Sequence, residues 1–492
     1  MTMTIEQRDG TAKLAPEAAE HRLRAPIAPT LVAGLVGLLD AAMMITTGIA
    51  AHLVLVLLAL HPLDSRYAVA AVFGAAVMLP VGRRRGLYTD GCIFHQSLPA
   101  RPLLLTVGIS FLMLLALAFI LKVSSDYSRL WLGLWMALAI TGLAVGRLAT
   151  GYRLRRLTAE GRLQVRVVIV GAGEHGQRLA QHLRCHGDAR TRVVGFIDDR
   201  LTRIPVQPCG LTVLGDVAHL IRLIRLGQVD EVYLALPWQA QARLTRLIER
   251  LAITPVHIRL GPDLIGFQLG SSTFSRVAGL PMLKVFDRPI SGWAHVAKRA
   301  EDVLVAGLAV LMLAPVMAAT ALAIKLDSPG PVFFRQRRQG FNDTLFEVWK
   351  FRTMYVDQAD ADCTVQTRKA DPRVTRVGAF LRKSSVDELP QLINVLRGDM
   401  SIVGPRPHAL STKAEGRLFQ DVVHKYAARH RVKPGITGWA QVNGWRGETD
   451  TIAKIERRVD CDLYYIDHWS LGFDLLIILK TALAVLKRDN AY

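Results

Sequence analysis

Hydrophobic residues are concentrated in the N-terminal third of the chain. Leu31 to Leu60 contains no Lys, Arg or Glu, and its only strongly polar side chains are Asp40 and His52. Three further apolar runs follow, at Tyr67–Val81, Leu103–Leu121 and Leu130–Thr150. About 20 apolar residues suffice to cross a bilayer, and four such runs in succession argue against core helices of a soluble domain. The pattern predicts a bundle of four transmembrane helices within 29–152, after a polar tail at 1–28.

Arginines at the ends of these runs predict how the bundle is oriented. They precede the first run, separate the second from the third and follow the fourth: Arg22, Arg24, Arg83, Arg84, Arg85, Arg101, Arg153, Arg155 and Arg156. Basic loops prefer the cytoplasm, so the N-terminal tail, the middle loop and everything after residue 151 are expected there. Asp40 lies inside the first span, and we interpret it as a partner in a helix–helix hydrogen bond rather than as a functional group.

A pattern typical of a nucleotide-binding α/β domain follows the bundle. The strand-like run Val165–Val170 leads into Gly171-Ala-Gly173-Glu-His-Gly176, then a helical stretch, then a second strand that ends at Asp198. Glycines at these positions permit a tight turn and a close approach of phosphate, and an acid about 20 residues later can bind ribose. Further strands are predicted at Glu231–Leu236 and Val256–Leu260. We therefore expect a Rossmann-like domain at 153–290.

The glycine fingerprint leaves the role of this domain open. Gly171, Gly173, Gly176 and Asp198 are candidate nucleotide-binding residues, but a single GxGxxG is weak evidence of catalysis. No Tyr-xxx-Lys constellation of a dehydrogenase follows it. A structural or regulatory role is favoured. The alternative, a membrane-anchored NAD-dependent nucleotide-sugar dehydratase or epimerase, would need a second fingerprint and a Tyr-xxx-Lys after residue 295.

A fifth apolar segment, Val303–Ile324, carries no charge and is long enough to span a membrane. Lys298 precedes it and Lys325 follows it, so both of its ends favour the cytoplasm. Pro315 lies near its middle, where proline removes a helix hydrogen bond and bends the helix. We predict a re-entrant helix–break–helix at 295–326 that enters and leaves the membrane on one side. A proline-kinked fifth span is the alternative.

Overall composition agrees with a membrane protein. The 492 residues are 51% hydrophobic and carry a formal charge of +20, which excludes a disordered chain and leaves nucleic-acid binding as a competing explanation of the charge. Five cysteines are dispersed without metal-ligand spacing, at Cys92, Cys185, Cys209, Cys363 and Cys461. Their dispersal favours reduced thiols over a disulfide framework or a structural zinc site.

The C-terminal part, 327–492, contains four short polar motifs. They are KFRTM at 350–354, SSVDELPQ at 384–391, SIVGPRP at 401–407 and KPGITGWAQVNG at 433–444. Cations, glycines, prolines and aromatic residues are interleaved around two adjacent carboxylates, Asp387 and Glu388. This arrangement is what a diphosphate substrate and a metal ion require, since phosphate oxygens are bound best by several directed cations.

These motifs, in this order, closely resemble those of the bacterial sugar transferases that move a phosphosugar from a nucleotide diphosphosugar onto a polyprenol phosphate. The resemblance spans 295–492. With the four spans and the α/β domain, the chain resembles the large branch of that family, and most of all the undecaprenyl-phosphate glucose phosphotransferases of exopolysaccharide synthesis. The resemblance implies a mixed α/β, mainly helical monotopic catalytic domain. It also implies transfer of a hexose 1-phosphate, with glucose favoured over galactose, from a UDP-sugar to undecaprenyl phosphate with release of UMP.

The same resemblance assigns roles to individual residues. Asp387 matches the family nucleophile, which would hold the phosphosugar covalently, and Glu388 matches the second acid. Mg²⁺ is the implied cofactor, and its implied ligands are Asp387, Glu388 and Asp462. The implied phosphate-binding residues are Arg382, Arg406, Arg446, Lys350 and Arg352. Small relatives carry Ser-Pro at the membrane break, whereas this chain has Ala314-Pro315.

Ser385 to Glu388 also fits a capping box, which predicts that Asp387 lies in the first turn of a helix. The N-terminus of that helix would keep the Asp387 carboxylate ionised and attract phosphate. A purely structural alternative for Glu388 is that it is only the reciprocal capping residue.

The expected location is the bacterial inner membrane, with the catalytic domain in the cytoplasm. The expected partners are a UDP-sugar, undecaprenyl phosphate and membrane lipid, without nucleic acid, and the choice between a monomer and a homodimer stays open. A nucleic-acid or anionic-lipid adaptor would explain the charge but not the ordered motifs. Phe473–Val485 is too short to span and predicts either an amphipathic helix on the membrane surface or a core helix.

Overall fold

The computed structural model describes residues 28–94, 99–187, 190–200, 208–237, 240–261, 274–277, 280–356, 371–408, 413–414, 417–418, 425–445 and 451–487. The chain folds into two compact units. One unit contains Ile27–Gln164 and Ile290–Glu301, and the other contains Val165–Pro289 and Asp302–Tyr492. The finer five-part division expected from the sequence stays a prediction.

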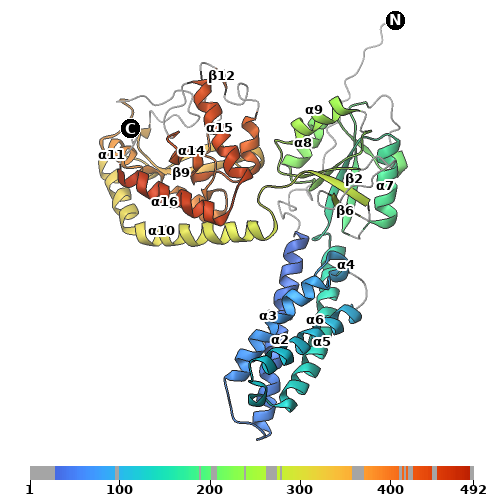
Figure 1. Cartoon of the computed structure of the whole chain (residues 1–492). Helices are drawn as coiled ribbons and strands as arrows, with labels where there is room; N and C mark the ends of the chain where they lie inside the picture. Colours follow the sequence, from blue (N-terminus) through green and yellow to red (C-terminus); the bar gives the residue numbers. More distant parts are fainter. Residues whose placement is uncertain are drawn as a thin grey trace. The chain divides into compact units, whose positions relative to one another are not determined.

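The first unit is a bundle of long apolar helices (Figure 1). Its helices are α2 (Pro29–Leu57), α3 (Arg66–Arg84), α5 (Ala100–Ile120) and α6 (Arg129–Ala159), with the short α4 (Asp90–Ile93) between α3 and α5. The four predicted apolar runs are therefore helices, as expected. All four are long and apolar enough to cross a membrane.

Small residues and tryptophans fill the interior of the bundle. The indole N–H of Trp131 donates to the Gly48 carbonyl over 3.0 Å, and that of Trp135 donates to the Met44 carbonyl over 3.0 Å. A Cβ added at Gly74 would come within 2.5 Å of the Trp135 ring. These bonds and close approaches hold α6 against α2 and α3, because no water is present in a bilayer core to satisfy an indole N–H.

Asp40 forms a buried ion pair with Arg147 of α6. The distance between Asp40 Oδ2 and Arg147 Nη2 is 2.5 Å, and both side chains are buried. Arg147 also donates to the Leu87 carbonyl over 3.4 Å and lies over the Tyr88 ring. The interpretation of Asp40 as an interhelical partner is confirmed, and its carboxylate joins two spans that are far apart in the sequence.

The second unit begins with a seven-stranded sheet of order β3-β2-β1-β4-β5-β7-β6. Its strands are β1 (Val165–Val170), β2 (Thr191–Ile197), β3 (Val213–Gly215), β4 (Glu231–Leu234), β5 (His257–Leu260), β6 (Phe274–Val277) and β7 (Leu280–Phe286). Strands β1 to β5 pair in parallel, and β6 and β7 are antiparallel additions. The order 3-2-1-4-5 is that of a Rossmann-like domain, which confirms the predicted fold of this region.

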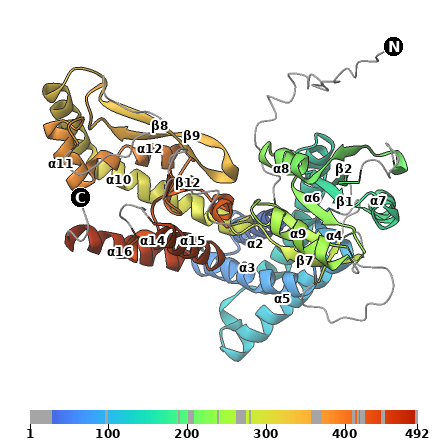
Figure 2. The same cartoon turned by 90° about the horizontal axis from the view of Figure 1, so that it is seen from above.

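Helices cover both faces of this sheet. Figure 2 shows α7 (Glu174–His186) on one side of β1 and β2, and α8 (Val217–Arg225) and α9 (Gln241–Leu251) on the other. Each helix buries one apolar stripe, exemplified by Leu179 and Leu183 of α7 and by Leu244, Leu247 and Leu251 of α9. The stripes follow the three-to-four-residue spacing of a helix that is apolar on one side.

In its described residues, the C-terminal region combines helices with three two-stranded sheets, of which the smallest pairs β11 (Lys413–Ala414) with β12 (Arg417–Leu418). The hairpin of β8 (Phe333–Gln339) and β9 (Leu345–Phe351) is one sheet, and the parallel pair β10 (Ser401–Val403) and β13 (Gly435–Thr437) is another. The helical elements in the described ranges are α10 (Gly292–Asp327), η4 (Phe341–Asp343), α11 (Arg376–Ser384), η6 (Val386–Glu388), α12 (Gln391–Arg397), η7 (Tyr426–Arg431), α14 (Trp439–Val442), α15 (Ile452–Asp467) and α16 (Leu471–Lys487). This mixed, mainly helical composition matches the expectation.

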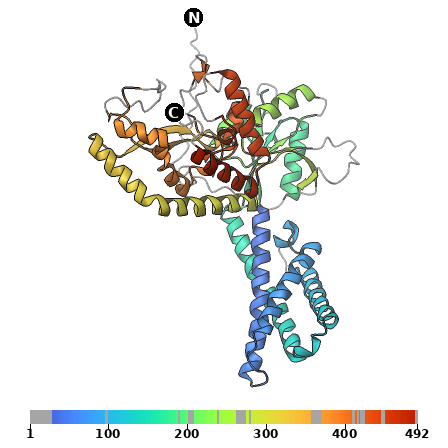
Figure 3. The ribbon, with the colours of Figure 1, turned by 60° about the vertical axis from the view of Figure 1, so that its left-hand side comes forward.

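Helix α10 contains the fifth apolar segment. It is assigned as one helix through Pro315, and Figures 1 and 3 show that it turns sharply partway along its length. Proline bends a helix because it cannot donate the next hydrogen bond. Asp302 is the first residue of α10 that belongs to the second unit. Its carboxylate accepts hydrogen bonds from the Ser401 hydroxyl and the Ile402 amide over 2.8 and 2.9 Å. Those bonds anchor α10 to β10, beside the segment that carries Arg406.

Candidate active site

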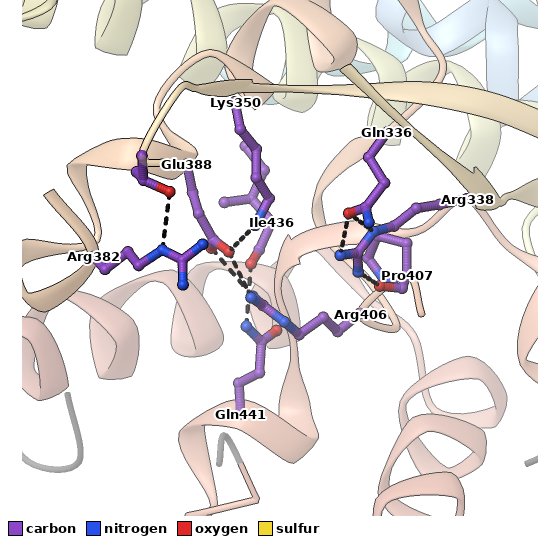
Figure 4. Close-up of polar contacts among 10 residues, drawn as sticks. Gln336, Arg338, Lys350, Arg382, Glu388, Arg406, Pro407, Ile436 and Gln441 are labelled. Atoms are coloured by element: carbon purple, nitrogen blue, oxygen red, sulfur yellow. Dashed lines mark hydrogen bonds and ion pairs between the residues drawn. The ribbon is translucent and has the colours of Figure 1, made fainter. Parts of the chain in front are cut away.

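Three segments that are distant in the sequence meet at Glu388 (Figure 4). Lys350 of β9 donates to Glu388 Oε1 over 2.9 Å. Arg406, which follows β10, donates to both carboxylate oxygens over 2.6 and 3.2 Å. The structure therefore brings together Lys350, Glu388 and Arg406 from the set predicted by sequence, and a two-pronged guanidinium contact fixes their mutual orientation.

Helix α12 holds the strand that carries Lys350. The side-chain oxygen Oδ1 of Asn394 accepts from the Trp349 backbone amide over 3.0 Å, and its side-chain nitrogen Nδ2 donates to the Glu347 backbone carbonyl over 2.7 Å. Asn394 is buried, so the two bonds replace a missing strand on this edge of β9. They fix the position of Lys350 relative to η6, which precedes α12 directly.

Asp387 and Glu388 lie in the short helix η6, and the predicted capping box is wrong. Ser385 adopts a left-handed conformation with φ of 58°, ends α11, and makes no side-chain capping bond. Helix α12 begins only at Gln391, after Pro390. The reason is that the Glu388 side chain turns to Lys350 and Arg406 instead of to the backbone. Asp387 therefore does not lie in the first turn of a long helix.

The two adjacent carboxyl groups have opposite electrostatic environments. Burial raises the pKa of Asp387, an effect that the Lys350 cation opposes and the Glu388 charge reinforces. Burial acts on Glu388 in the same direction, but the Arg406 and Lys350 cations hold the pKa of Glu388 well below its usual range. Among the residues that the structure describes, Asp387 has no hydrogen-bond or ion-pair partner. Asp387 is thus the carboxylate that is still available to a substrate.

The remaining basic residues of the predicted set have other contacts. Arg382 Nε donates to the Thr353 hydroxyl over 2.9 Å, which places its guanidinium next to the Glu388 cluster in Figure 4. Arg352 is buried and donates to the carbonyls of Ser328 and Pro329 over 2.7 and 2.9 Å. Arg352 therefore braces the turn before β8, and its role in phosphate binding stays a prediction. Arg446 lies outside the described residues.

The loop that carries Arg406 is held by two arginines that are not among the predicted site residues. Arg429 of η7 donates to the Arg406 carbonyl over 2.8 Å. Arg338 of β8 donates to the Pro407 carbonyl and, over 2.7 Å, to the Gln336 side chain, as Figure 4 shows. Neither arginine belongs to a motif with a sequence spacing that predicts such contacts. The only sequence feature at Arg429 is a short basic run that also fits a solvated surface.

Asp462 lies in α15 and is paired with Arg429. Asp462 Oδ2 accepts from Arg429 Nε over 2.9 Å, and both residues are buried. Burial raises the pKa of Asp462, and the Arg429 cation opposes this effect. The carboxylate is thus engaged by a guanidinium, and its predicted role as a metal ligand stays a prediction.

The donor set near Asp387 suits a hard cation that is shared with a substrate. Within the described ranges, no three His, Cys, Asp or Glu side chains come together as a metal site would require. Magnesium usually takes one or two protein carboxylates and completes its shell with water and substrate phosphates. Asp387 and Glu388 meet that minimum. Asp387 is the stronger candidate of the two, because both oxygens of Glu388 are bonded to cations.

The acid of the glycine fingerprint is used by the Rossmann-like domain itself. Asp198 is buried and accepts from the Ala172 amide over 3.1 Å. It also accepts from Arg200 and Arg243 over 3.3 and 2.9 Å. With these bonds the carboxylate closes its own glycine loop, so its oxygens are already engaged where a ribose would be bound.

The glycines of this loop satisfy a packing requirement. Gly171 has φ of +107°, a conformation that other residues adopt only with strain. A Cβ at Gly176 would lie 1.8 Å from the Gly171 carbonyl oxygen, whereas a Cβ at Gly173 would meet nothing within 4 Å. The first and last glycines are therefore needed for the turn and for the approach of α7, whatever the domain binds. A cavity of about 370 Å³ lies beside α7, lined among others by His175, Arg178, His182 and Leu236.

Two protein families match parts of this chain. The bacterial sugar transferase family matches residues 293–488. A family described as a CoA-binding domain matches residues 83–262. The first match covers the whole site around Glu388, and the second covers the glycine fingerprint.

Relatives match over most of their own length. A UDP-glucose:undecaprenyl-phosphate glucose-1-phosphate transferase of Escherichia coli (strain K12) is 41% identical over 366 residues, 74% of this chain and 76% of that protein. A protein of the same name from Xanthomonas campestris pv. campestris is 38% identical and covers 76% of this chain and 78% of its own. An undecaprenyl-phosphate glucose phosphotransferase of Komagataeibacter xylinus is 40% identical, over 73% of this chain and 66% of that protein.

Proposed function

The chain belongs to the bacterial sugar transferases, and on this basis we propose that it transfers glucose 1-phosphate from UDP-glucose to undecaprenyl phosphate. The products are UMP and undecaprenyl-diphospho-glucose, which begins an exopolysaccharide repeat unit. The observation that carries the proposal is the arrangement at η6. Asp387, a carboxylate that has no hydrogen-bond partner among the described residues, lies next to a carboxylate that is clamped between Lys350 and Arg406.

Asp387 acts as the nucleophile in this proposal. Its carboxylate oxygen forms a bond to the β-phosphorus of UDP-glucose, and the bond from that phosphorus to the bridging oxygen breaks. The bridging oxygen leaves with the electron pair as part of UMP. An oxygen of undecaprenyl phosphate then attacks the same phosphorus, the acyl-phosphate bond breaks, and the carboxylate is regenerated.

Glu388 and its two cations prepare the site for this displacement. Lys350 and Arg406 supply positive charge where the diphosphate must lie, and fixed charges of this kind are most effective when they need not reorganise. Glu388 keeps the two cations at a fixed separation through bonds of 2.9 and 2.6 Å. Burial of Asp387 removes part of its hydration, which favours a nucleophile that must attack an anionic phosphate. Bound Mg²⁺, held by Asp387 and Glu388, would add further neutralisation of the diphosphate.

The membrane arrangement follows from the two substrates. UDP-glucose is soluble in water and undecaprenyl phosphate is anchored in lipid, so the site must lie at the membrane surface. We place it on the cytoplasmic side of the inner membrane, with α10 entering and leaving on that side. The basic residues at the ends of the apolar helices support this orientation. A reporter fused after residue 326 should be cytoplasmic, whereas a periplasmic reporter would refute the re-entrant arrangement.

A direct test is Asp387→Asn in the full-length protein, assayed in native membranes with undecaprenyl phosphate. UMP release from UDP-glucose should fall by on the order of 10³-fold or more, because the neutral amide is a poor nucleophile. Asp371→Asn, an acidic residue before α11 that pairs with Arg373, is the matched control and should retain activity. Wild-type turnover by Asp387→Asn would exclude this carboxylate as the nucleophile. UDP-galactose and UDP-N-acetylgalactosamine in the same assay decide the sugar.

The alternative of an NAD-dependent nucleotide-sugar dehydratase or epimerase finds no support in the fingerprint geometry. Asp198, which such an enzyme would use for the cofactor ribose, is occupied by Ala172, Arg200 and Arg243. Conversion of a UDP-sugar that needs NAD and no lipid would revive this alternative.

A further inference from the structure

Two buried arginines flank a single histidine behind the proposed active site. Arg429 of η7 and Arg458 of α15 are 1% and 5% exposed. Arg429 Nη1 lies 2.7 Å from His408 Nδ1, and Arg458 Nη1 lies 3.2 Å from His408 Nε2. His408 is two residues after Arg406 on the same loop, so the two guanidinium groups lie at the two nitrogens of a ring that belongs to this loop.

Each arginine also binds a main-chain carbonyl. Arg429 Nη2 donates to the Arg406 carbonyl over 2.8 Å. Arg458 donates to the Trp445 carbonyl through Nε and Nη2, over 3.0 and 2.5 Å. A guanidinium offers five donors in a rigid fork, and each side chain uses that fork to bind a backbone carbonyl while lying against the histidine between them.

Asp462 provides the anion of this cluster. It lies four residues after Arg458 on α15 and accepts from Arg429 Nε over 2.9 Å. Burial and the neighbouring Arg429 and Arg458 cations lower the pKa of His408 well below its usual range, so the ring is neutral. A neutral imidazole has one acceptor nitrogen and one N–H. With Nδ1–H donating to the Tyr426 hydroxyl, 2.7 Å away, Nε2 accepts from Arg458, and Arg429 holds the loop through the Arg406 carbonyl. The cluster therefore concentrates positive charge next to Arg406.

We propose that Arg429 and Arg458 are positioning residues for the transfer reaction, which hold the Arg406–His408 loop so that the Arg406 guanidinium meets the substrate diphosphate. This inference rests on the proposed function, since Arg406 faces Glu388 in the proposed site. Neither arginine touches the reacting groups in this scheme. They act on the backbone of Arg406 and on the ring of His408.

Arg458 gives the sharper test, because its burial carries a cost in stability. Burial, together with repulsion from Arg429 and Arg406, lowers the pKa of Arg458 to about 10. A base whose pKa falls on folding is less stable as a cation in the folded protein than in the unfolded chain. Arg458→Gln should therefore leave the melting temperature unchanged or higher. A residue kept only for stability would behave in the opposite way.

The experiment measures Arg458→Gln and the matched control Arg457→Gln, an exposed neighbour on α15, in the full-length membrane protein. We expect Arg458→Gln to lower kcat/KM for UDP-glucose about tenfold, mostly through KM, since a displaced binding group weakens orientation of the substrate. The affinity for UDP, measured by calorimetry, should fall by a similar factor, and Arg457→Gln should match the wild type in both. An unchanged kcat/KM and UDP affinity in Arg458→Gln would overturn the inference, as would a loss that only follows the fraction of folded protein.

Arg429 is tested with a double variant because removing it alone strands the buried Asp462. Arg429→Gln with Asp462→Asn removes both charges of the pair, which limits the penalty of an uncompensated buried carboxylate. The double variant should fold to near the wild-type melting temperature and still lose about tenfold in UDP affinity. Wild-type affinity in a folded double variant would contradict the role of Arg429.

Failure of the proposed function is distinguishable from failure of this inference. If the wild-type protein releases no UMP from any UDP-sugar in the presence of undecaprenyl phosphate, the proposed function is wrong. The calorimetric comparison of UDP binding then decides the inference alone. Weaker binding by Arg458→Gln than by Arg457→Gln supports it, and equal binding, or none by the wild type, refutes it.

Discussion

Buried or partly buried acids bonded to cations occur in two parts of this chain, at Asp198 and at Glu388, and they have different roles. In the Rossmann-like domain, Asp198 accepts from two backbone amides and two arginine side chains and is buried. In the catalytic domain, Glu388 takes up the neighbouring cations, and Asp387 beside it is left without a partner among the described residues. The engaged oxygens of Asp198 hold its own glycine loop, whereas those of Glu388 hold two cations beside Asp387 and so leave Asp387 available for chemistry.

Electrostatics express the same contrast. The arginines around Asp198 more than offset its burial and lower its pKa. Burial dominates at Asp387 and raises its pKa. Perturbation of a carboxyl group upward, in a site that gathers cations, is a common property of reactive groups, while a lowered pKa is typical of a structural ion pair.

The largest effect that would sharpen this comparison is on the rate of transfer. Glu388→Gln should lower kcat for UMP release by about 10²- to 10³-fold, since loss of the anion releases two cations that act in the transition state. Asp198→Asn should leave kcat of the folded protein unchanged. Steady-state assays of both variants in membranes provide the measurement. Equal losses of kcat in the two variants would show that Glu388 and Asp198 do not differ in their contribution to the reaction.

Stability should change in opposite directions in the two regions. Asp198→Asn removes bonds to a charged acceptor and should lower the free energy of unfolding by about 2 kcal/mol. The contribution of Asp198 is present above the ordinary pKa of aspartate and is lost as the pH falls through its lowered value. The raised pKa of Asp387 has the reverse consequence, so Asp387→Asn should raise the melting temperature at neutral pH. Thermal unfolding in detergent measures both changes in melting temperature. A lower melting temperature for Asp387→Asn would contradict the predicted difference between the two acids.

The smallest predicted effect is a shift in the pH dependence of the reaction. Asp387 must be ionised to attack, so activity should fall with decreasing pH, with a midpoint above that of an ordinary aspartate. Lys350→Met removes a cation that opposes the effect of burial, and its residual activity should be lost at still higher pH. Rate–pH profiles of wild type, Lys350→Met and Asp198→Asn test this. An identical midpoint in wild type and Lys350→Met would separate Lys350 from the ionisation of Asp387.

Sequence patterns were sufficient where the physics is local or repeats along the chain. Apolar runs gave four bundle helices because a helix in lipid must satisfy its backbone internally and cover it with apolar side chains. The strands around the glycine fingerprint were found because buried parallel strands are continuous apolar runs. Proline near the middle of the fifth segment predicted the turn in α10 for an equally local reason.

Sequence patterns failed where a local rule competed with distant partners. The spacing of Ser385 and Glu388 fits a capping box, yet Glu388 binds Lys350 and Arg406, which are 38 and 18 residues away. Asp198 has the position of a ribose ligand, but Arg243 comes from a helix 45 residues further on and engages it. A charged partner in a buried site outweighs a capping bond of about 1 kcal/mol.

What the sequence determined by itself is therefore the set of elements and the family to which the motifs belong. The resemblance of its motifs to those of sugar transferases marked Asp387 and Glu388 as candidate catalytic residues, and Lys350 and Arg406 as candidate phosphate-binding residues. Only the tertiary structure showed which acid is bonded to cations and which is available to a substrate. It also showed that Arg429 and His408 contact each other beside the Arg406 loop. The physical reason is that the charge state and the partners of a buried group depend on what folding brings beside it, which the linear order of residues does not contain.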